Sequence, residues 1–201
     1  MLKKIINGRS PNIFLKKLFN LRVERVFPRG FERFGVSGKN LIGVEIGVFE
    51  GEHALSLIKN LNLKKLYLID PYVIHDSYSP EWRKSIIQAQ REVYELSKKH
   101  SNVKVIFKYS DEALKEIGEK VDFVYIDGDH SYEAVKKDIN NYWKIVKDGG
   151  LLGGHDVHNA VRPHNRGVMK AVFEFALSEK LDVVIQGEDW WVKKPLPKSR
   201  K

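Results

Sequence analysis

Acidic and imidazole side chains follow two apolar segments of this sequence. The first segment, Val121–Ile126, is short and β-branched, as a buried strand is, and it runs directly into Asp127-Gly128-Asp129-His130. The second begins at Leu151 and runs into His155-Asp156. Carboxylates and imidazoles bind metal ions and move protons, and unpaired charges are costly to bury. These residues therefore predict a ligand-binding site, with an ordinary solvated loop as the alternative.

A helix is expected between the two segments. Ser131 is a typical helix-capping residue. The apolar residues that follow share one helical face, and they are Val135, Ile139, Trp143 and Val146. Gly149-Gly150 is expected to end the helix before the second strand. Strands joined by a helix run parallel, so both tips should lie at the sheet edge where ligands bind.

A glycine loop near residue 47 predicts a nucleoside ligand. The strand in Leu41–Gly51 carries Glu45, Gly47 and Gly51 in the pattern E-x-G-x-x-x-G, and a helix from Glu52 to about Asn60 follows. Gly47 allows a close approach to the backbone, and the helix start offers N–H groups to an anion. The next strand, Lys65–Ile69, ends in Asp70, which is placed to accept ribose hydroxyls. A helix-capping role for Asp70 is the alternative.

Further strands and helices alternate through the rest of the chain. A polar helix over 81–100 is expected to turn Trp82, Ile86, Val93 and Leu96 inward, and the strand Val103–Phe107 leads to Ser110 and Asp111. These two residues either contact a purine, or Ser110 simply caps a helix over 111–117. A loop over 157–167 follows the second strand tip, and its basic residues are His158, Arg162, His164 and Arg166. These basic residues are equally consistent with binding of an anionic or polyhydroxylated substrate and with an ordinary solvated loop.

The last elements are a helix over 168–178, the strand Asp182–Gln186 and a closing hairpin strand, Asp189–Lys193. Trp190 and Trp191 are expected to pack within the sheet. The alternation predicts an α/β fold with a Rossmann-like, seven-stranded, mostly parallel sheet, helices on both faces and an antiparallel final strand. Residues 41–194 form this domain, after a basic extension over 1–40 (a lid, docking or oligomerisation segment) and before a basic tail over 195–201.

Composition restricts the classes of protein. The 201 residues include no cysteine, which excludes disulfides and thiolate chemistry and fits a cytoplasmic location. No apolar run is long enough for a transmembrane helix. Residues 1–40 carry a charge of +8 and residues 193–201 carry +5, so the residues between them carry −4 of the net +9. The basic ends suit nucleic acid, anionic lipid or a phosphorylated substrate, although solubilising arms are the commoner explanation.

The chain resembles class I S-adenosylmethionine-dependent methyltransferases, and in particular the small-molecule O-methyltransferases of the macrolide-sugar, cephalosporin-hydroxylase-like and catechol types. The resemblance covers roughly residues 42–194. The segments that carry it are VEIGVFEG (44–51), LIDPY (68–72), YIDGDHSYEAV (125–135), GGLLGGHD (149–156) and EDWWVKK (188–194). IDGDHSYE followed by GGHD is its specific part.

The resemblance implies S-adenosyl-L-methionine as cofactor and a small polar acceptor, such as a sugar. It places Glu45, Gly47, Phe49 and Gly51 at the methionine end, Asp70 on the ribose, and Ser110 and Asp111 at the adenine, with Asp127 also beside the cofactor. His130 is then the general base, because a neutral imidazole accepts protons near pH 7.

In metal-dependent members of the family, acids at two strand tips hold a divalent cation such as Mg²⁺ or Mn²⁺, and the matching residues here are Asp127, His155 and Asp156. His155 departs from the usual second acid. Because Mg²⁺ prefers oxygen ligands, an imidazole is better suited to Mn²⁺, Fe²⁺ or Zn²⁺. The requirement for a metal is therefore left open by the sequence.

Two other functions compete with small-molecule O-methylation. The basic ends are compatible with methylation of RNA or protein, and the fold alone is compatible with a non-catalytic nucleoside-binding protein. Asp70-Pro71-Tyr72 superficially resembles an amino-methyltransferase motif but follows the second strand rather than the fourth. The acceptor and the oligomeric state, a homo-oligomer included, are not determined by the sequence.

Overall fold

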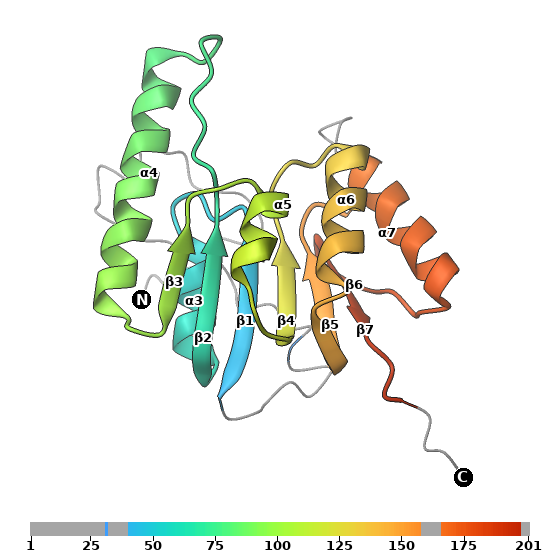
Figure 1. Ribbon diagram of the computed structural model, residues 1–201. Helices are drawn as coiled ribbons and strands as arrows, with labels where there is room; N and C mark the ends of the chain where they lie inside the picture. The colour runs from blue at the N-terminus through green and yellow to red at the C-terminus, as the bar shows by residue number, and fades with distance from the viewer. Residues whose placement is uncertain (1–30, 32–39, 158–165, 198–201) are drawn as a thin grey trace, which may run out of the picture.

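A twisted sheet of seven strands with helices packed on both faces forms the described part of the chain (Figure 1). The computed structural model describes residue 31 and residues 40–157 and 166–197. The strands are β1 (Leu41–Ile46), β2 (Leu63–Ile69), β3 (Val103–Ile106), β4 (Val121–Ile126), β5 (Val146–Gly154), β6 (Val184–Gln186) and β7 (Asp189–Lys193). The helices are α3 (Glu52–Asn60), α4 (Pro80–Lys99), α5 (Ser110–Ala113), α6 (Tyr132–Tyr142) and α7 (Arg166–Glu179), with a 3₁₀ turn over Leu114–Glu116.

The strand order is β3-β2-β1-β4-β5-β7-β6, in which β7 runs antiparallel to both of its neighbours and the other pairs are parallel. The predicted fold class, including the antiparallel last strand, is thus confirmed. The chain proceeds outward from β1 in one direction to β3 and then returns to place β4 on the other side of β1. This reversal is the point at which open α/β sheets bind ligands beyond the carboxyl ends of their strands.

Two hydrophobic layers hold the helices to the sheet. Helices α3 and α4 cover one face, and α5, α6 and α7 cover the other (Figure 1). Strand β1 is buried along its whole length, as expected for the central strand. Trp190 and Trp191 are fully buried on opposite faces of β7, which confirms that they pack within the sheet.

Helix α6 ends earlier than the sequence pattern predicts. It stops at Tyr142, and Val146, expected on the helix, is the first residue of β5. The reason is strand pairing: Val146 lies opposite Val121, and the register shifts before Phe123, so β5 extends well ahead of the two glycines. The glycines at 149 and 150 therefore lie inside a strand. Their backbone exchanges hydrogen bonds with Lys194.

Two side chains differ from their expected positions. Trp82, expected inward, is 40% exposed and stacks on Phe49 with ring centroids 5.4 Å apart. Ser110 does not cap a helix, because it is the first residue of α5 and Tyr109 occupies the capping position without a side-chain hydrogen bond. The Ser110 hydroxyl instead donates a hydrogen bond to Asp138. Helix α5 is also shorter than predicted.

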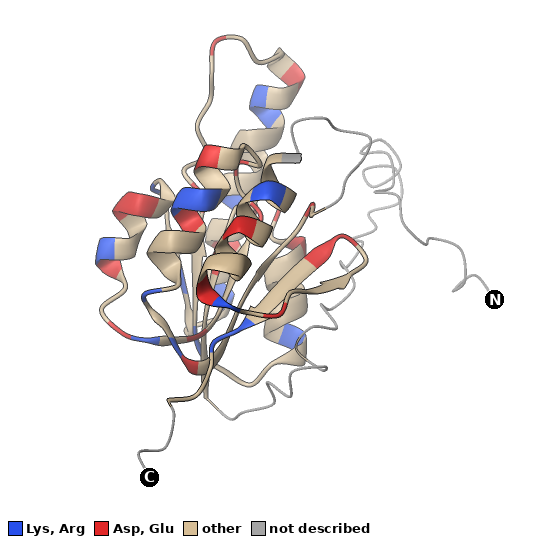
Figure 2. Ribbon diagram, turned by 90° about the vertical axis from the view of Figure 1, so that its right-hand side faces the viewer, with Lys and Arg blue, Asp and Glu red and all other residues tan. Residues whose placement is uncertain are grey.

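Several expectations fall outside the described residues. These are the role of the basic extension over 1–40, of which only residues 31 and 40 are described, and the side chains of His158, Arg162, His164 and Arg166. In the described part, Lys and Arg are interspersed with Asp and Glu over the helices (Figure 2). None of the described helices combines the length and apolar character needed to cross a bilayer.

Candidate active site

A cavity of about 750 Å³ lies at the carboxyl edge of the sheet, where the strand order reverses. This volume is in the range of small-molecule sites. Six residues predicted for the cofactor line it: Gly47, Phe49, Asp70, Ser110, Asp111 and Asp127. Aromatic residues supply much of the remaining wall, namely Tyr72, Tyr78, Trp82 and Tyr109. The structure therefore brings together groups from β1, β2, β3 and β4.

Glu45 and Gly51, two other predicted cofactor residues, do not line this cavity. Glu45 is 1% exposed, and its Oε2 lies 3.4 Å from Nδ1 of the equally buried His53. The His53 ring stacks on Tyr125 with centroids 4.0 Å apart. Since neighbouring side chains on a strand point to opposite faces, Glu45 reaches the layer under α3. Gly51 precedes α3 in a left-handed conformation and is buried.

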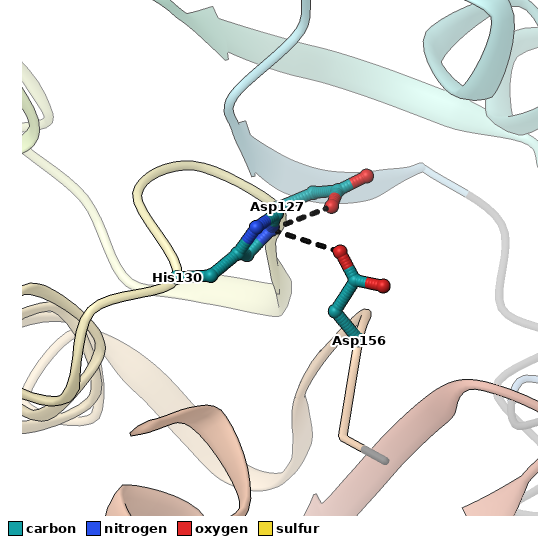
Figure 3. A group of neighbouring side chains, drawn as sticks. All are labelled: Asp127, His130 and Asp156. Atoms are coloured by element: carbon teal, nitrogen blue, oxygen red, sulfur yellow. Dashed lines mark hydrogen bonds and ion pairs between the residues drawn. The ribbon is translucent and has the colours of Figure 1, made fainter. Parts of the chain in front are cut away.

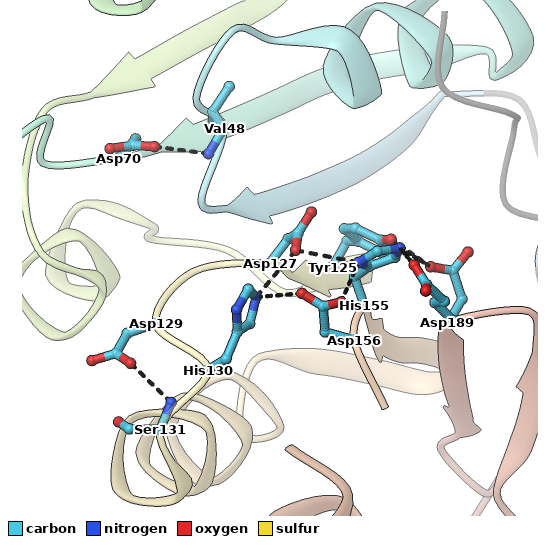
Figure 4. Close-up of polar contacts among 11 residues, drawn as sticks. Val48, Asp70, Tyr125, Asp127, Asp129, His130, Ser131, His155, Asp156 and Asp189 are labelled. Carbon is cyan, nitrogen blue, oxygen red and sulfur yellow. Dashed lines mark hydrogen bonds and ion pairs between the residues drawn. The ribbon is translucent and has the colours of Figure 1, made fainter. Parts of the chain in front are cut away.

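Asp70 fixes the glycine loop. Its Oδ2 accepts a hydrogen bond from the backbone N–H of Val48 at 3.0 Å (Figure 4) and another from that of Phe49, also at 3.0 Å. Its Oδ1 accepts one from the N–H of Tyr72 at 2.9 Å. Because Oδ1 accepts only one hydrogen bond from the described residues and has a second acceptor position, Asp70 retains the capacity to accept a ribose hydroxyl.

Gly47 is required by close packing as well as by its conformation. Its φ is +82°, and an added Cβ would lie 2.1 Å from the carbonyl oxygen of Asp127. A backbone hydrogen bond of 2.7 Å from Asp127 to Ile46 joins the two loops at the same point. The glycine thus lets the loop after β4 lie against the loop after β1.

His130 lies between two carboxylates from neighbouring strand tips (Figure 3). Its Nε2 is 3.4 Å from Oδ1 of Asp127 and 3.3 Å from Oδ2 of Asp156. Burial alone would lower the pKa of His130, but the hydrogen bond to Asp127 and the charges of Asp127 and Asp156 outweigh it and raise the pKa above its ordinary value of 6.5. The loop that carries His130 is held by Asp129, whose Oδ1 accepts the N–H of Ser131 at 2.8 Å.

Asp156 adopts an unusual backbone conformation at the end of β5. Its φ is +59°, in the left-handed region, and the residue is 5% exposed. Non-glycine residues in this region are under strain and concentrate at functional sites. The strain at Asp156 therefore supports a functional role for this tip of the sheet.

His155 faces acids from both of its ring nitrogens (Figure 4). Nδ1 lies 3.4 Å from Oδ1 of Asp156 and 3.8 Å from Oδ1 of Asp127. On the other side, Nε2 lies 3.3 Å from Oε2 of Glu188 and 4.0 Å from Oδ1 of Asp189. The hydroxyl of the fully buried Tyr125 donates to that same Asp189 oxygen at 2.7 Å. Glu188 and Asp189 were not predicted, because only the β6–β7 turn brings them to this edge.

Asp138 is another cavity residue that the sequence analysis did not identify. It lies on α6, is 5% exposed, and accepts a hydrogen bond from the Ser110 hydroxyl. Burial raises the pKa of Asp138 to about 6. The sequence signal that could have identified Asp138 is its position next to Ile139, on the buried side of the predicted helix. An acid is costly to bury there, so its presence indicates a specific role.

The chemistry of these donors fits a divalent cation. Among the residues that the structure describes, two groups of side chains bring ligand atoms within 4.8 Å of one another, and both include Asp156. One group contains Asp127 and His130, and the other contains His155 and Glu188. The expected ligands Asp127, His155 and Asp156 are thus divided between the two groups. Mixed carboxylate and imidazole donors suit Mn²⁺, Fe²⁺ or Zn²⁺ better than Mg²⁺.

Comparison with known proteins identifies the family of this chain. Residues 44–157 match the sequence model of a methyltransferase domain family. An uncharacterized protein of Acanthamoeba polyphaga mimivirus is 34% identical over 118 residues, which are 56% of this chain and 50% of that protein. The match thus spans about half the length of this curated relative.

Solved structures share the fold at low identity. An O-methyltransferase from Bacillus cereus in complex with SAH has a TM-score of 0.54 and 16% identity, over 90% of this chain and 88% of that chain. The MycE methyltransferase of the mycinamycin biosynthetic pathway, in complex with Mg, SAH and mycinamycin VI, has a TM-score of 0.56 and 14% identity, over 87% of this chain and 50% of that chain. With more than half of its residues matching the family model, the chain belongs to the methyltransferase domain family and has the fold of the class I S-adenosylmethionine-dependent methyltransferases.

Proposed function

We propose that this chain transfers a methyl group from S-adenosylmethionine to an oxygen of a small polar acceptor, with His130 as the general base. The observation that carries the proposal is the position of the His130 Nε2 atom, within 3.4 Å of the carboxylates of Asp127 and Asp156. Asp127 also lines the cavity, so this imidazole stands at the border between a cofactor site and the strand tips.

The cavity supplies a site for the cofactor. We assign the ribose to Asp70, whose carboxylate already anchors the glycine loop, and the methionine end to the loop at Gly47 and Phe49. When bound, S-adenosylmethionine supplies a methyl group on a positively charged sulfur. What the protein adds is alignment and exclusion of water, and the aromatic wall of Phe49, Tyr72 and Trp82 serves both.

His130 takes the proton that the acceptor hydroxyl loses as the new bond to carbon forms. The imidazole must be neutral to do so, and the two carboxylates then stabilise the imidazolium that results. Asp127 and Asp156 also fix the direction of the ring, so that the base is positioned before the acceptor arrives.

Asp127, Asp156 and His155 are the residues that we propose for a divalent cation. His155 is preferred over His130 because its second nitrogen faces Glu188 at 3.3 Å, as a ligating imidazole is usually oriented by an outer carboxylate. A cation there would bind the acceptor oxygen and make its proton more acidic.

The acceptor class is inferred from the groups at the strand tips. The strand tips carry a cluster of polar side chains rich in hydrogen-bond acceptors, formed by Asp127, His130, His155 and Asp156. Such a cluster suits a polyhydroxylated molecule such as a sugar. In line with this, the MycE methyltransferase, which has the same fold, was crystallised with mycinamycin VI and Mg.

The experiment combines binding with turnover. Titration calorimetry with S-adenosylhomocysteine should show binding to the wild type and no binding to Asp70→Ala. A screen with isotope-labelled S-adenosylmethionine then compares free sugars, nucleotide sugars and catechols as acceptors. For the acceptor found, His130→Ala should reduce kcat by about 10²- to 10⁴-fold, while its affinity for S-adenosylhomocysteine stays within about threefold of wild type.

His100→Ala is the matched control, since this histidine follows α4, remote from the strand tips, and its replacement should leave kcat unchanged. Equal losses of affinity and turnover in His130→Ala would contradict the assignment of the base. Failure of the wild type to bind S-adenosylhomocysteine would contradict the proposed function itself.

A further inference from the structure

Buried Asp138 and half-buried Ser110 form a hydrogen-bonded pair at one end of the cavity. Both line the cavity, and the Ser110 hydroxyl donates to Oδ1 of Asp138. The hydroxyl of Tyr142, a fully buried residue, donates to the Ser110 carbonyl oxygen at 2.7 Å. Ser110 is thus fixed through its backbone and its side chain, and it holds the Asp138 carboxylate in one orientation.

The second oxygen of Asp138 is available to a ligand. Among the described residues, Oδ2 accepts no hydrogen bond. Asp138 is 5% exposed but lines the cavity, so a ligand in the cavity can reach this oxygen. A ligand that donates to this oxygen would form a hydrogen bond in a largely buried setting, where such bonds are little screened by water. Burial also raises the pKa of Asp138 to about 6.

Asp111, the acid expected at the adenine, is engaged elsewhere. Its Oδ2 pairs with Nζ of Lys137 at 2.6 Å, and its Oδ1 accepts the N–H of Glu112 at 3.0 Å. Its side chain is 41% exposed, so water screens what it can offer to a ligand. Of the two acids at this end, Asp138 is the buried one with an unused acceptor atom.

The position of this pair matches the base of the nucleoside. The strand tips with Asp127 and His130 mark the reacting end, and Asp70 at the end of β2 is the ribose residue of the proposed function. Ser110 follows β3, which lies beyond β2 on the side away from β4. A nucleoside with its ribose at Asp70 therefore extends its base toward Ser110 and the neighbouring Asp138.

We propose that Asp138, held by Ser110, recognises the exocyclic amino group of the adenine and so selects the cofactor's base. This inference rests on the proposed function. A carboxylate accepts a hydrogen bond from the amino group, whereas a 6-oxo purine turns a carbonyl oxygen toward it, and two acceptors repel each other. Sites built to bind a polar group strongly reject an analogue that lacks it.

The test compares S-adenosylhomocysteine with S-inosylhomocysteine, in which an oxygen replaces the amino group. Titration calorimetry at pH 8 is performed on the wild type, Asp138→Asn and Asp111→Asn. The wild type should favour the adenosyl compound by about tenfold or more. Asp138→Asn keeps an oxygen for the Ser110 hydroxyl but offers an NH₂ group to the base, so this preference should vanish or reverse. Asp111→Asn is the matched control and should keep the wild-type preference.

The inference is overturned if Asp138→Asn retains the preference, or if Asp111→Asn loses it instead. Circular dichroism and thermal unfolding of both variants show whether each is folded under the conditions of the titration. A wild type that binds the adenosyl and inosyl compounds equally would overturn the inference and leave the proposed function intact. A wild type that binds neither would overturn both.

Discussion

Nε2 of His130 lies 3.3 Å from Oδ2 of Asp156, a buried carboxylate from the end of the neighbouring strand. Together with Asp127, this carboxylate favours the charged imidazolium and raises the pKa of His130. A general base, however, must be neutral. The proposed activity should therefore increase with pH as His130 loses its proton. The midpoint of this increase should lie above pH 6.5, the ordinary pKa of a histidine.

Removing one of these charges should move the titration of His130. In Asp156→Asn, the imidazolium loses one of its stabilising carboxylates, so the pKa of His130 should fall. NMR titration of the His130 ring in chelator-treated protein measures this directly. Asp129→Asn serves as the control with a smaller expected shift, because Asp129 contributes least among the groups that act on His130. An unchanged or raised pKa in Asp156→Asn would contradict the ion pair as the cause.

Replacement of Gly47 should destabilise the protein through the close approach of two loops. In Gly47→Ala, the new Cβ would lie 2.1 Å from the Asp127 carbonyl oxygen, at a φ of +82°. The backbone strain and the displaced loop together should cost about 2–5 kcal/mol. Urea unfolding measures this loss in the free energy of unfolding. Gly187→Ala is the matched control, since its φ is +64° and no atom lies within 4 Å of the added Cβ.

In Gly187→Ala only backbone strain should act, and it should lower the free energy of unfolding by about 1 kcal/mol. Equal losses in the two variants would mean that the contact between the loops contributes nothing.

The same contact explains why the role of Gly47 could be predicted only in part from the sequence. Gly47 was expected to admit a ligand, but the backbone of Asp127 that approaches it belongs to the loop after β4, far along the chain.

The strand tips were predictable because their signals are local. A β-branched segment that ends abruptly in acids, as at Asp127, indicates both a buried strand and a polar site at its end. Parallel connections then require the tips of β4 and β5 to be neighbours, which the observed register of Ile126 with Gly154 bears out. The antiparallel β7 follows from the tight turn that joins it to β6.

Other features depend on contacts that are remote in sequence. Val146 extends β5 only because Val121 is opposite to it, so the helical pattern there was misleading. Glu188 and Asp189 reach His155 through the turn between β6 and β7. Glu45 was expected at the cofactor, whereas the structure pairs it with buried His53. In each case the partner, rather than the local pattern, determines where the side chain lies.

The buried Asp138 should make stability depend on pH. Its pKa is about 6 in the folded protein and 3.8 as its ordinary value, so the folded state binds this proton more tightly than the unfolded state. Its contribution to stability is fully present below about pH 3.8 and is lost as the pH rises through about 6. At pH 8 the charged carboxylate therefore costs up to about 3 kcal/mol relative to acid.

Asp138→Asn cannot ionise and should avoid that cost. Its stability relative to wild type should increase between pH 4.5 and pH 8, by an amount on the order of 1–3 kcal/mol. Urea unfolding of the two proteins at pH 4.5, 6 and 8 measures the difference. A difference that is constant across this range would show that Asp138 titrates normally. Asp111→Asn, in which the changed carboxyl is exposed, provides the comparison.

Metal binding can separate the roles of the two histidines. Chelator-treated protein should bind one Mn²⁺ or Co²⁺ per chain, as measured by calorimetry and by the visible spectrum of Co²⁺, and Asp127→Ala should abolish binding. His155→Ala should weaken it by about 10- to 100-fold, because an imidazole ligand is lost, whereas His130→Ala should change it by less than about threefold. Glu188→Gln tests the outer carboxylate and should give a smaller loss than His155→Ala. If His130→Ala causes the larger loss, the cation belongs with Asp127, His130 and Asp156, and the general base must be sought elsewhere.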